Sequence, residues 1–362
     1  MIVIAYGVNW LSTEAFQPEM IRSLKDNVLQ IMIYGGRFTK SKIPEAVAQI
    51  NQILAQYPDT KELVLHYSHE IAPKLASTVD SDALSSLDKI QCKNITIFYG
   101  DINVKENLRW NFQNNIEFIG YDTFHWKHKE HLLWLNFSEL GYRRDFDRKC
   151  SKKFSSLIGV IKNHRIYIAS ELFRQGYFDK GYISCVKYKG HTDPNKTVQL
   201  ENLHKKDYFF VEDIEDRYYQ LLPHFQVADF EILNKKDGKQ VCSSPLNWFS
   251  DSYFNIVNET SFSNDWPYNE LFITEKTFKP IVHQMPFIVA GSAGTLEYLK
   301  SRGYQTFPEI FDESYDNEPN SYKRIAMIVE QIKRACDDPE LHDKVYSIQG
   351  KLKHNRNIFF NV

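Results

Sequence analysis

The feature that most constrains the fold of this chain is an alternation of short β-rich runs with helix-length segments. Up to residue 120, the β-rich runs are Ile2–Tyr6, Val28–Tyr34, Glu62–Tyr67, Asn94–Tyr99 and Ile116–Ile119. The segment Ile43–Tyr57, between the second and third runs, carries apolar residues near the 3.6-residue spacing of a helix. Strands that alternate with helices are typical of a mostly parallel sheet covered by helices, so we predict an α/β fold.

The same alternation returns in the second half of the chain. We predict strands at residues 155–161, 253–257 and 286–290, and helices through 165–173, from about Thr274, over 295–302 and over 322–335. A chain of 362 residues is long enough for two domains of ordinary size. We therefore expect one α/β domain over residues 1–150, a second over residues 151–345, and a C-terminal tail over residues 346–362.

Composition narrows the class of protein. Hydrophobic residues make up 43% and charged residues 25% of the chain, which excludes a disordered or fibrous protein. The formal net charge of -2 does not call for a polyanionic partner. No apolar run reaches the length of a membrane span, and the apolar start Ile2–Ala5 reads as a strand rather than a signal peptide. The five scattered cysteines favour free thiols in a reducing compartment, so we expect a cytoplasmic protein.

The residues that most clearly indicate a binding site lie between 250 and 316. Glu259 directly follows an apolar strand, and Thr274 is placed as a helix N-cap ahead of Glu275 and Lys276. A first helical turn presents backbone N–H groups and the positive end of the helix dipole, which together favour an anion. Gly291-Ser292-Ala293-Gly294, between a strand and a helix, offers a second place for close approach of a ligand. Each feature alone is more often structural, and their occurrence in one α/β unit is what points to a site.

The order of these residues resembles a known family. The run Tyr253-Phe254-Asn255-Ile256-Val257-Asn258-Glu259-Thr260, then Phe272-Ile273-Thr274-Glu275-Lys276-Thr277-Phe278-Lys279-Pro280, looks like the donor-binding region of GT-B glycosyltransferases. It is most similar to the α-1,3-fucosyltransferase-like group and to glycosyltransferases of large phages and marine viruses. The resemblance covers about residues 155–185 and 250–316. It departs from true fucosyltransferases after Lys276 and so indicates a nucleotide sugar without indicating GDP-fucose.

The resemblance implies a fold, an activity and roles for particular residues. The fold is of GT-B type, with two Rossmann-like domains facing a central cleft, the first on the acceptor side and the second binding the nucleotide sugar. Glu275 and Lys276 would contact ribose and phosphates, Arg165 the diphosphate, and Glu259 the sugar or nucleotide. Thr274, Gly291 and Ser292 complete the expected donor site. The activity would be transfer of a sugar from a UDP- or GDP-linked donor to an acceptor hydroxyl, in the host cytoplasm if the chain is viral.

No metal or other cofactor is expected in that chemistry. Lysine, arginine and helix amides would stabilise the charge of the departing nucleotide, so a cation is not required. A metal-dependent transferase would place an Asp-x-Asp pair at a strand end. The two such pairs here are Asp80-Ser81-Asp82, in a polar serine-rich segment, and Asp145-Phe146-Asp147, among basic residues.

The acceptor side offers several candidates for a catalytic base. An inverting reaction needs a carboxylate or histidine to take the proton of the acceptor hydroxyl. Glu70 (with His69 beside it), Asp101 and Asp122 follow strands of the first domain, and parallel sheets gather ligands at the carboxyl ends of their strands. A retaining reaction would not need this base, and the sequence favours neither stereochemistry.

The acceptor itself is open. A saccharide or lipid-linked glycan is the broad expectation. The basic and aromatic residues of His125–Lys129 and Arg143–Lys153 are of the types that bind a nucleic-acid backbone. They are therefore compatible with a viral enzyme that glycosylates a hydroxymethylated base in DNA. A third hypothesis is a nucleotide- or glycan-binding module without catalysis. An oxidoreductase is disfavoured because no GxGxxG follows the first strand, and no P-loop occurs. The oligomeric state is not predicted.

Overall fold

A computed structural model describes residues 2–6, 27–33, 43–67, 84–99, 102–104, 111–120, 144–185, 209–226, 231–232, 235–236, 239–240, 243–244, 246–262 and 271–361. Contacts within the chain divide it into two compact units. Unit 1 comprises Met1–Lys127 and Pro267–Phe272, and unit 2 comprises His128–Trp266 and Ile273–Val362. The expected boundaries at residues 150 and 345 and the function expected for each domain stay predictions.

Unit 1 is built on a parallel sheet of five strands. They are β1 (Ile2–Tyr6), β2 (Val28–Ile33), β3 (Glu62–Tyr67), β4 (Asn94–Tyr99) and β5 (Asn115–Gly120), and they lie side by side in chain order. Each neighbouring pair is parallel. The alternation in the sequence therefore predicted both the strands and their relative direction.

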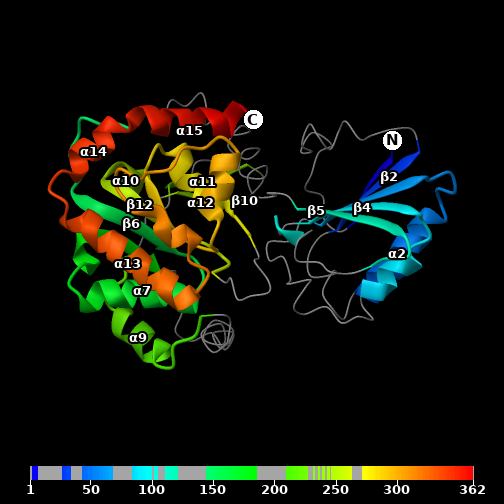
Figure 1. Cartoon of the computed structure of the whole chain (residues 1–362), viewed down its shortest axis with the longest axis horizontal. Coiled ribbons are helices and arrows are strands. Elements are labelled where there is room, and N and C mark those ends of the chain that lie inside the picture. Colours follow the sequence, from blue (N-terminus) through cyan, green and yellow to red (C-terminus); the bar gives the residue numbers. More distant parts are fainter. Residues whose placement is uncertain are drawn as a thin grey trace. The chain divides into compact units, whose positions relative to one another are not determined.

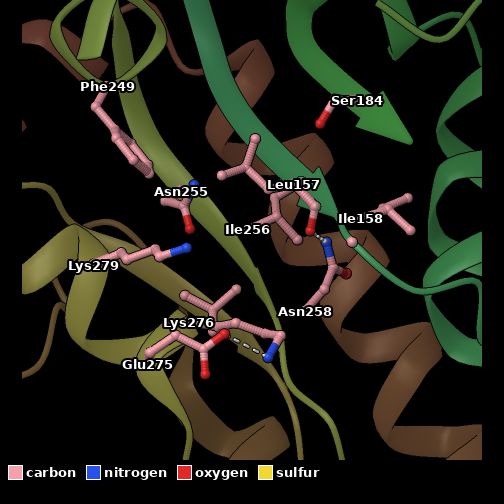
Figure 2. Close-up of a pocket in the computed structure, with 12 residues that line it drawn as sticks. Leu157, Ile158, Ser184, Phe249, Asn255, Ile256, Asn258, Glu275, Lys276 and Lys279 are labelled. Carbon is pink, nitrogen blue, oxygen red and sulfur yellow. Dashed lines mark hydrogen bonds and ion pairs between the residues drawn. The ribbon is translucent and has the colours of Figure 1, made fainter. Parts of the chain in front are cut away.

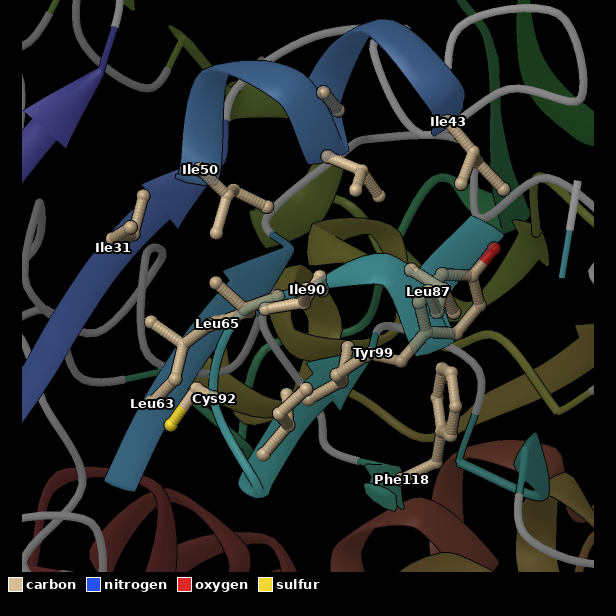
Figure 3. Close-up of a cluster of buried hydrophobic side chains, with 14 of the residues drawn as sticks. Ile31, Ile43, Ile50, Leu63, Leu65, Leu87, Ile90, Cys92, Tyr99 and Phe118 are labelled. Atoms are coloured by element: carbon tan, nitrogen blue, oxygen red, sulfur yellow. The ribbon is translucent and has the colours of Figure 1, made fainter. Parts of the chain in front are cut away.

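The core of unit 1 lies between this sheet and helix α2 (Ile43–Leu54). Ile43 and Ile50 are one to two helical turns apart and face strand residues such as Ile31, Leu63 and Leu65 (Figure 3). The 3₁₀ helix η2 (Ser86–Lys89) adds its own apolar residue to the same cluster. Burial of such side chains contributes about 1.5–3 kcal/mol each, which makes this the stabilising centre of the unit.

Unit 2 has a parallel sheet of four strands whose order differs from the order in the chain. The strands are β6 (Lys152–Ile158), β7 (Gly181–Cys185), β12 (Ser252–Asn258) and β13 (Phe287–Ala290). They are arranged β13-β12-β6-β7, and all neighbours are parallel. The chain thus adds β7 on one side of β6 and then returns to add β12 on the other side. The point between β6 and β12 is a topological switch point, where open parallel sheets leave a crevice for ligands.

Helices cover both faces of this sheet (Figure 1). On one side lie α7 (Asn163–Arg174), α9 (Ile214–Leu221) and α13 (Ser321–Asp337); on the other lie α11 (Glu275–Val282) and α15 (Gln349–Asn361). The remaining helices are α10 (Leu246–Ser250), α12 (Thr295–Ser301) and α14 (Leu341–Ser347), with 3₁₀ helices η3 (Phe178–Lys180) and η5 (Glu313–Asn317). Two short antiparallel pairs join β9 (Lys235–Lys236) to β10 (Lys239–Gln240) and β8 (Glu231–Ile232) to β11 (Ser243–Ser244).

The α/β class with parallel sheets is therefore confirmed. Helix α15 falls in the segment expected to be a tail, and its Phe359 is fully buried against Phe278 of α11, with ring centroids 5.7 Å apart. The weak amphipathic pattern of this segment gave no signal for a helix. Among the helices that the structure describes, none combines the length and the apolar character needed to cross a membrane.

Candidate functional site

A pocket lies between α11 and the carboxyl halves of β6 and β12, at the switch point of the unit 2 sheet. The last residues of β6 (Leu157 and Ile158) and the segment Asn255–Asn258 of β12 line one side, and Glu275, Lys276 and Lys279 of α11 line the other. Its volume is about 590 Å³, counting space that is open to solvent. Figure 2 shows the charged side chains of α11 extending toward the strand ends. The pocket therefore has an apolar and amide wall facing a charged wall.

Two asparagines give the strand wall its polar groups. Asn255 and Asn258 are buried, although β12 is otherwise an apolar strand. The Nδ2 group of Asn255 donates to the carbonyl oxygen of Ser155 at 3.0 Å, and that of Asn258 donates to the hydroxyl of Ser156 at 2.8 Å. These bonds fasten β12 to β6 beyond the backbone ladder. Among the described residues, the Oδ1 atom of Asn258 is a buried acceptor without a hydrogen-bond donor.

Glu259 follows β12 directly and holds the start of α11. Its side chain is inside the protein, with 1% of the residue exposed. Oε1 accepts from the backbone N–H of Thr274 at 3.1 Å and from the hydroxyl of Thr277 at 2.6 Å. Oε2 accepts from the hydroxyl of Thr274 at 2.6 Å and from the backbone N–H of Thr260 at 3.1 Å. A buried carboxylate is stable only with such partners, and here they join the strand end to the helix start.

This arrangement changes the expected anion site. Thr274 is the N-cap of α11, as predicted, and Glu275 and Lys276 lie in the first turn. The anion beside this helix start, however, is the chain's own Glu259 carboxylate. The backbone N–H of Lys276 bonds to the Thr274 hydroxyl at 3.4 Å, and that of Thr277 bonds to the Thr274 carbonyl at 3.1 Å. The backbone N–H groups of Lys276 and Thr277 are thus engaged at the helix start itself.

Glu275 and Lys276 form an ion pair at the pocket. Lys276 Nζ lies 2.9 Å from Glu275 Oε1, and their side chains are 25% and 31% exposed respectively. Desolvation by itself would raise the pKa of Glu275, but the nearby Lys276 and Lys279 ammonium groups hold that pKa below its usual value. Glu275 is therefore an ionised carboxylate at neutral pH, with both oxygens able to accept hydrogen bonds.

Arg165 lies behind this site, inside the protein, with 2% of the residue exposed. Its NH1 and NH2 groups donate to the carbonyl oxygens of Val160 at 2.9 Å and Glu259 at 2.7 Å. Burial lowers the pKa of Arg165 to about 10 against the attraction of Glu259 and Glu275, so it remains charged at neutral pH. The structure thus points the Arg165 guanidinium at backbone carbonyl oxygens, one of them that of Glu259, and its expected contact with a diphosphate stays a prediction.

His164 also contacts the backbone of Glu259. Its Nε2 lies 3.1 Å from the Glu259 carbonyl oxygen, and its ring stacks on Phe262 with centroids 4.9 Å apart. Burial, followed by the charges of Arg165 and Lys162, lowers the pKa of His164 well below its usual value. The ring is therefore neutral, with the proton on the nitrogen that faces the carbonyl.

Close packing and backbone conformation account for the two glycines of the loop Gly291–Gly294. A Cβ atom on Gly291 would lie 3.2 Å from Glu259 Cβ and 3.0 Å from Val289 Cγ1, so a larger residue would push against the Glu259 and Val289 side chains. Gly294 has φ of 81°, a conformation that glycine adopts without strain. Ser292 is buried, and its hydroxyl has no partner among the described residues. Neither Gly291 nor Ser292 lines the pocket at the switch point.

An internal carboxylate also occupies the start of α12. Asp316 Oδ2 accepts from the backbone N–H groups of Leu296 at 3.0 Å and Glu297 at 3.1 Å. Desolvation raises the pKa of Asp316 despite these bonds. The start of α12, which follows the loop expected to approach a ligand, is thus capped by a carboxylate of the protein itself.

Three predicted residues lie outside the part of the chain that the structure describes. Glu70, Asp101 and Asp122 follow β3, β4 and β5 in the sequence, and their role as a catalytic base stays a prediction. In the described part of the basic run, Arg144 is 7% exposed and its NH1 group donates to the Phe249 carbonyl oxygen at 2.9 Å. Arg148 pairs with Asp251 at 3.1 Å. Both side chains therefore bond to other residues of unit 2.

Lys279, Asn255 and Asn258 line the pocket but were not selected from the sequence. A signal existed for each. Lys279 is three residues after Lys276, the spacing that brings two side chains to one helix face. Two asparagines within an apolar strand contradict its buried pattern, which marks them for a hydrogen-bonding role.

A search of the described residues finds no group of three or more histidines, cysteines or acids that is placed to hold a metal ion. No family model, curated protein or solved structure matches the chain.

Proposed function

We propose that the protein is a glycosyltransferase that moves a sugar from a nucleotide-sugar donor to an acceptor hydroxyl. In this proposal unit 2 binds the donor, unit 1 carries the acceptor side, and the two form a GT-B enzyme. The chemistry breaks the bond between the anomeric carbon and the diphosphate and forms a bond to the acceptor oxygen. The nucleoside diphosphate leaves with the electron pair of the broken bond, and the acceptor hydroxyl gives up its proton, in an inverting reaction to a base such as Glu70, Asp101 or Asp122.

One observation carries the proposal: a pocket with two lysines and a glutamate lies at the switch point of a parallel sheet. Nucleotides bind at such crevices in other α/β folds, because loops from two strand ends can enclose a ligand there. Lys276 and Lys279 supply positive charge for a diphosphate, and Glu275 supplies an acceptor for ribose hydroxyls. Fixed positive charge in a partly desolvated site stabilises a leaving diphosphate without a metal.

The proposal assigns Glu259 and Arg165 to positioning. Glu259 holds the start of α11 through three hydrogen bonds, from Thr274 and Thr277, so the side chains of Glu275 and Lys276 keep their direction toward the pocket. Arg165 ties the Glu259 carbonyl oxygen to the segment that follows β6. Together they make the charged wall rigid before a ligand arrives, which lowers the entropic cost of binding.

The test combines binding with turnover. UDP, GDP and dTDP are titrated calorimetrically into wild type and into the double variant Lys276→Ala/Lys279→Ala, without added metal and then with Mg²⁺. Wild type should bind one of the three nucleotides, and the double variant should lose most of the affinity for it. The matching UDP- or GDP-sugar is then incubated with wild type and glycan acceptors, and release of the nucleotide is followed.

The outcomes separate the hypotheses. If no nucleotide binds with or without Mg²⁺, the proposal fails. Binding without any release of nucleotide from its sugar, with glycan or hydroxymethylated DNA present, would instead indicate a non-catalytic binding module. Sugar found on hydroxymethylated DNA, together with salt-dependent DNA binding, would indicate the DNA-modifying alternative.

A further inference from the structure

Gly159 is the residue directly after β6, and it is an exposed part of the pocket wall. Among the described residues, no atom beyond those of its two chain neighbours lies within 4 Å of the place that a Cβ atom on Gly159 would take. Its φ angle also lies outside the left-handed region that favours glycine. The fold of the described residues therefore leaves room for a side chain at position 159.

Other glycines of unit 2 have a structural reason to lack a side chain. A Cβ atom on Gly181 would lie 2.2 Å from Cε2 of Phe154, which no packing tolerates. Gly294 and Gly303 have φ angles of 81° and 87°. A glycine without such a reason costs stability, because it loses more backbone freedom on folding than alanine does. The feature that an absent side chain at Gly159 does affect is the space inside the pocket.

The backbone on both sides of Gly159 is held by side chains. The carbonyl oxygen of Leu157 accepts from Nδ2 of Asn258 at 3.4 Å, and that of Val160 accepts from the NH1 group of Arg165 at 2.9 Å. A shift of this segment away from the pocket would break these bonds. A side chain added at position 159 would therefore take up pocket space instead of moving the wall back.

The wall that contains Gly159 differs in chemistry from the wall that faces it. The charged side chains that the structure describes in the pocket all belong to α11. Residues 157–159 of the β6 segment add two apolar side chains and the bare backbone of Gly159. Figure 2 shows Ile158 and Lys279 on opposite sides of Ile256. A nucleoside diphosphate has the same division, since its diphosphate is charged and its base is a flat ring without a formal charge.

We infer that the nucleobase of the ligand lies against the Gly159 backbone, in the space that the missing side chain leaves open. This inference rests on the proposed function, because it assigns the base end of the same ligand. The base packs on the Gly159 peptide beside Leu157 and Ile158, while the diphosphate lies toward the charged side chains of α11. Gly159 is thus a specificity residue, because a side chain there excludes the base and leaves the position of the diphosphate open.

The test compares the variants Gly159→Ala and Gly159→Leu with wild type, using the nucleotide that wild type binds. Gly159→Leu should weaken nucleotide binding by about 10-fold or more, the scale on which overfilling a fitted space acts. Gly159→Ala should cause a smaller loss in the same direction. Neither variant should lower the thermal unfolding temperature, since a side chain at this position restricts the unfolded chain and meets no obstacle in the folded one.

Inorganic pyrophosphate is the probe that lacks a base. Its affinity is measured from its competition with the nucleotide, in wild type and in both variants. Because pyrophosphate needs only the charged wall, its affinity should be the same in all three proteins. The ratio of nucleotide affinity to pyrophosphate affinity should therefore fall as the side chain at position 159 becomes larger.

Gly350→Leu is the matched control. Gly350 is exposed in α15, and among the described residues no atom lies within 4 Å of its expected Cβ position. It does not line the pocket. The same change of glycine to leucine there should leave the affinities for nucleotide and for pyrophosphate unchanged.

The outcomes distinguish this inference from the proposed function. If Gly159→Leu binds the nucleotide as tightly as wild type does, the inference is overturned while the proposed function stands. An equal loss of nucleotide and pyrophosphate affinity in Gly159→Ala, or a failure of pyrophosphate to compete in wild type, also overturns the placement of the base. If wild type binds no nucleotide, the proposed function itself fails.

Discussion

Replacement of Glu259 by glutamine separates a structural carboxylate from one that meets a ligand. Oε1 and Oε2 each accept from one backbone N–H group and one threonine hydroxyl. A carboxamide keeps only one acceptor oxygen, and its NH₂ group must face either the Thr274 or the Thr260 N–H. The threonine hydroxyl on that side can turn and accept, but the backbone N–H cannot.

The magnitude follows from these bonds. Glu259→Gln loses a charged hydrogen bond, worth about 1.5–3 kcal/mol, and leaves a buried N–H group without an acceptor, which costs about 1–3 kcal/mol. The expected loss is therefore about 3–5 kcal/mol, a large part of the 5–15 kcal/mol that is typical of a folded domain. Amide hydrogen exchange should show the first turn of α11 opening more readily.

The assay is urea unfolding followed by circular dichroism, with Glu297→Gln as the matched control. Glu297 is exposed in the first turn of α12, so the same chemical change there should cost under about 1 kcal/mol. The reasoning is refuted if Glu259→Gln unfolds at the wild-type urea concentration and yet loses nucleotide affinity, because Glu259 would then face the ligand.

Two further predictions concern buried cations and histidines. Arg165→Lys should destabilise unit 2 by about 2–4 kcal/mol in thermal unfolding, since one ammonium cannot replace a fork that bonds to two carbonyl oxygens; unchanged stability with weaker nucleotide binding would contradict this. Burial lowers the pKa of His283 to about 3 and that of His164 well below its usual value, so the unfolded chain binds more protons below pH 6.5. Stability should therefore be lost as the pH falls from 7 to 5, by about 2 kcal/mol for each histidine. Urea unfolding at both pH values measures this, and His283→Gln should remove about 2 kcal/mol of the loss; equal stability at pH 7 and 5 would refute it.

The parts of the fold that depend on local pattern could be predicted from the sequence. The strands of unit 1 and the N-cap at Thr274 follow from periodicity and from the residue types that cap helices. Strand order in unit 2 could not be predicted in this way. The strand order depends on which strand β12 pairs with after the long segment between β7 and β12. No local sequence pattern indicates that pairing.

The candidate site shows the same division. The segment Thr274–Lys276 was found because its residues are adjacent in sequence. Glu259 was selected because it follows an apolar strand, and its expected contact with the sugar or nucleotide stays a prediction. Three of the four bonds to its carboxylate come from Thr274 and Thr277, 15 and 18 residues further along the chain, and only the folded structure brings these groups together. The expected contact of Arg165 with a diphosphate stays a prediction. The direction of its guanidinium depends on the carbonyl group of Val160, five residues before it, and on that of Glu259, 94 residues after it.

The central claim is that the pocket between the ends of β6 and β12 binds the nucleoside diphosphate of a sugar donor. A crystal structure of the protein with the nucleotide selected by calorimetry tests it most directly. We expect diphosphate density beside Lys276 and Lys279, and ribose hydroxyls within hydrogen-bond distance of the Glu275 carboxylate. A nucleotide bound elsewhere on the protein, with this pocket empty, would contradict it.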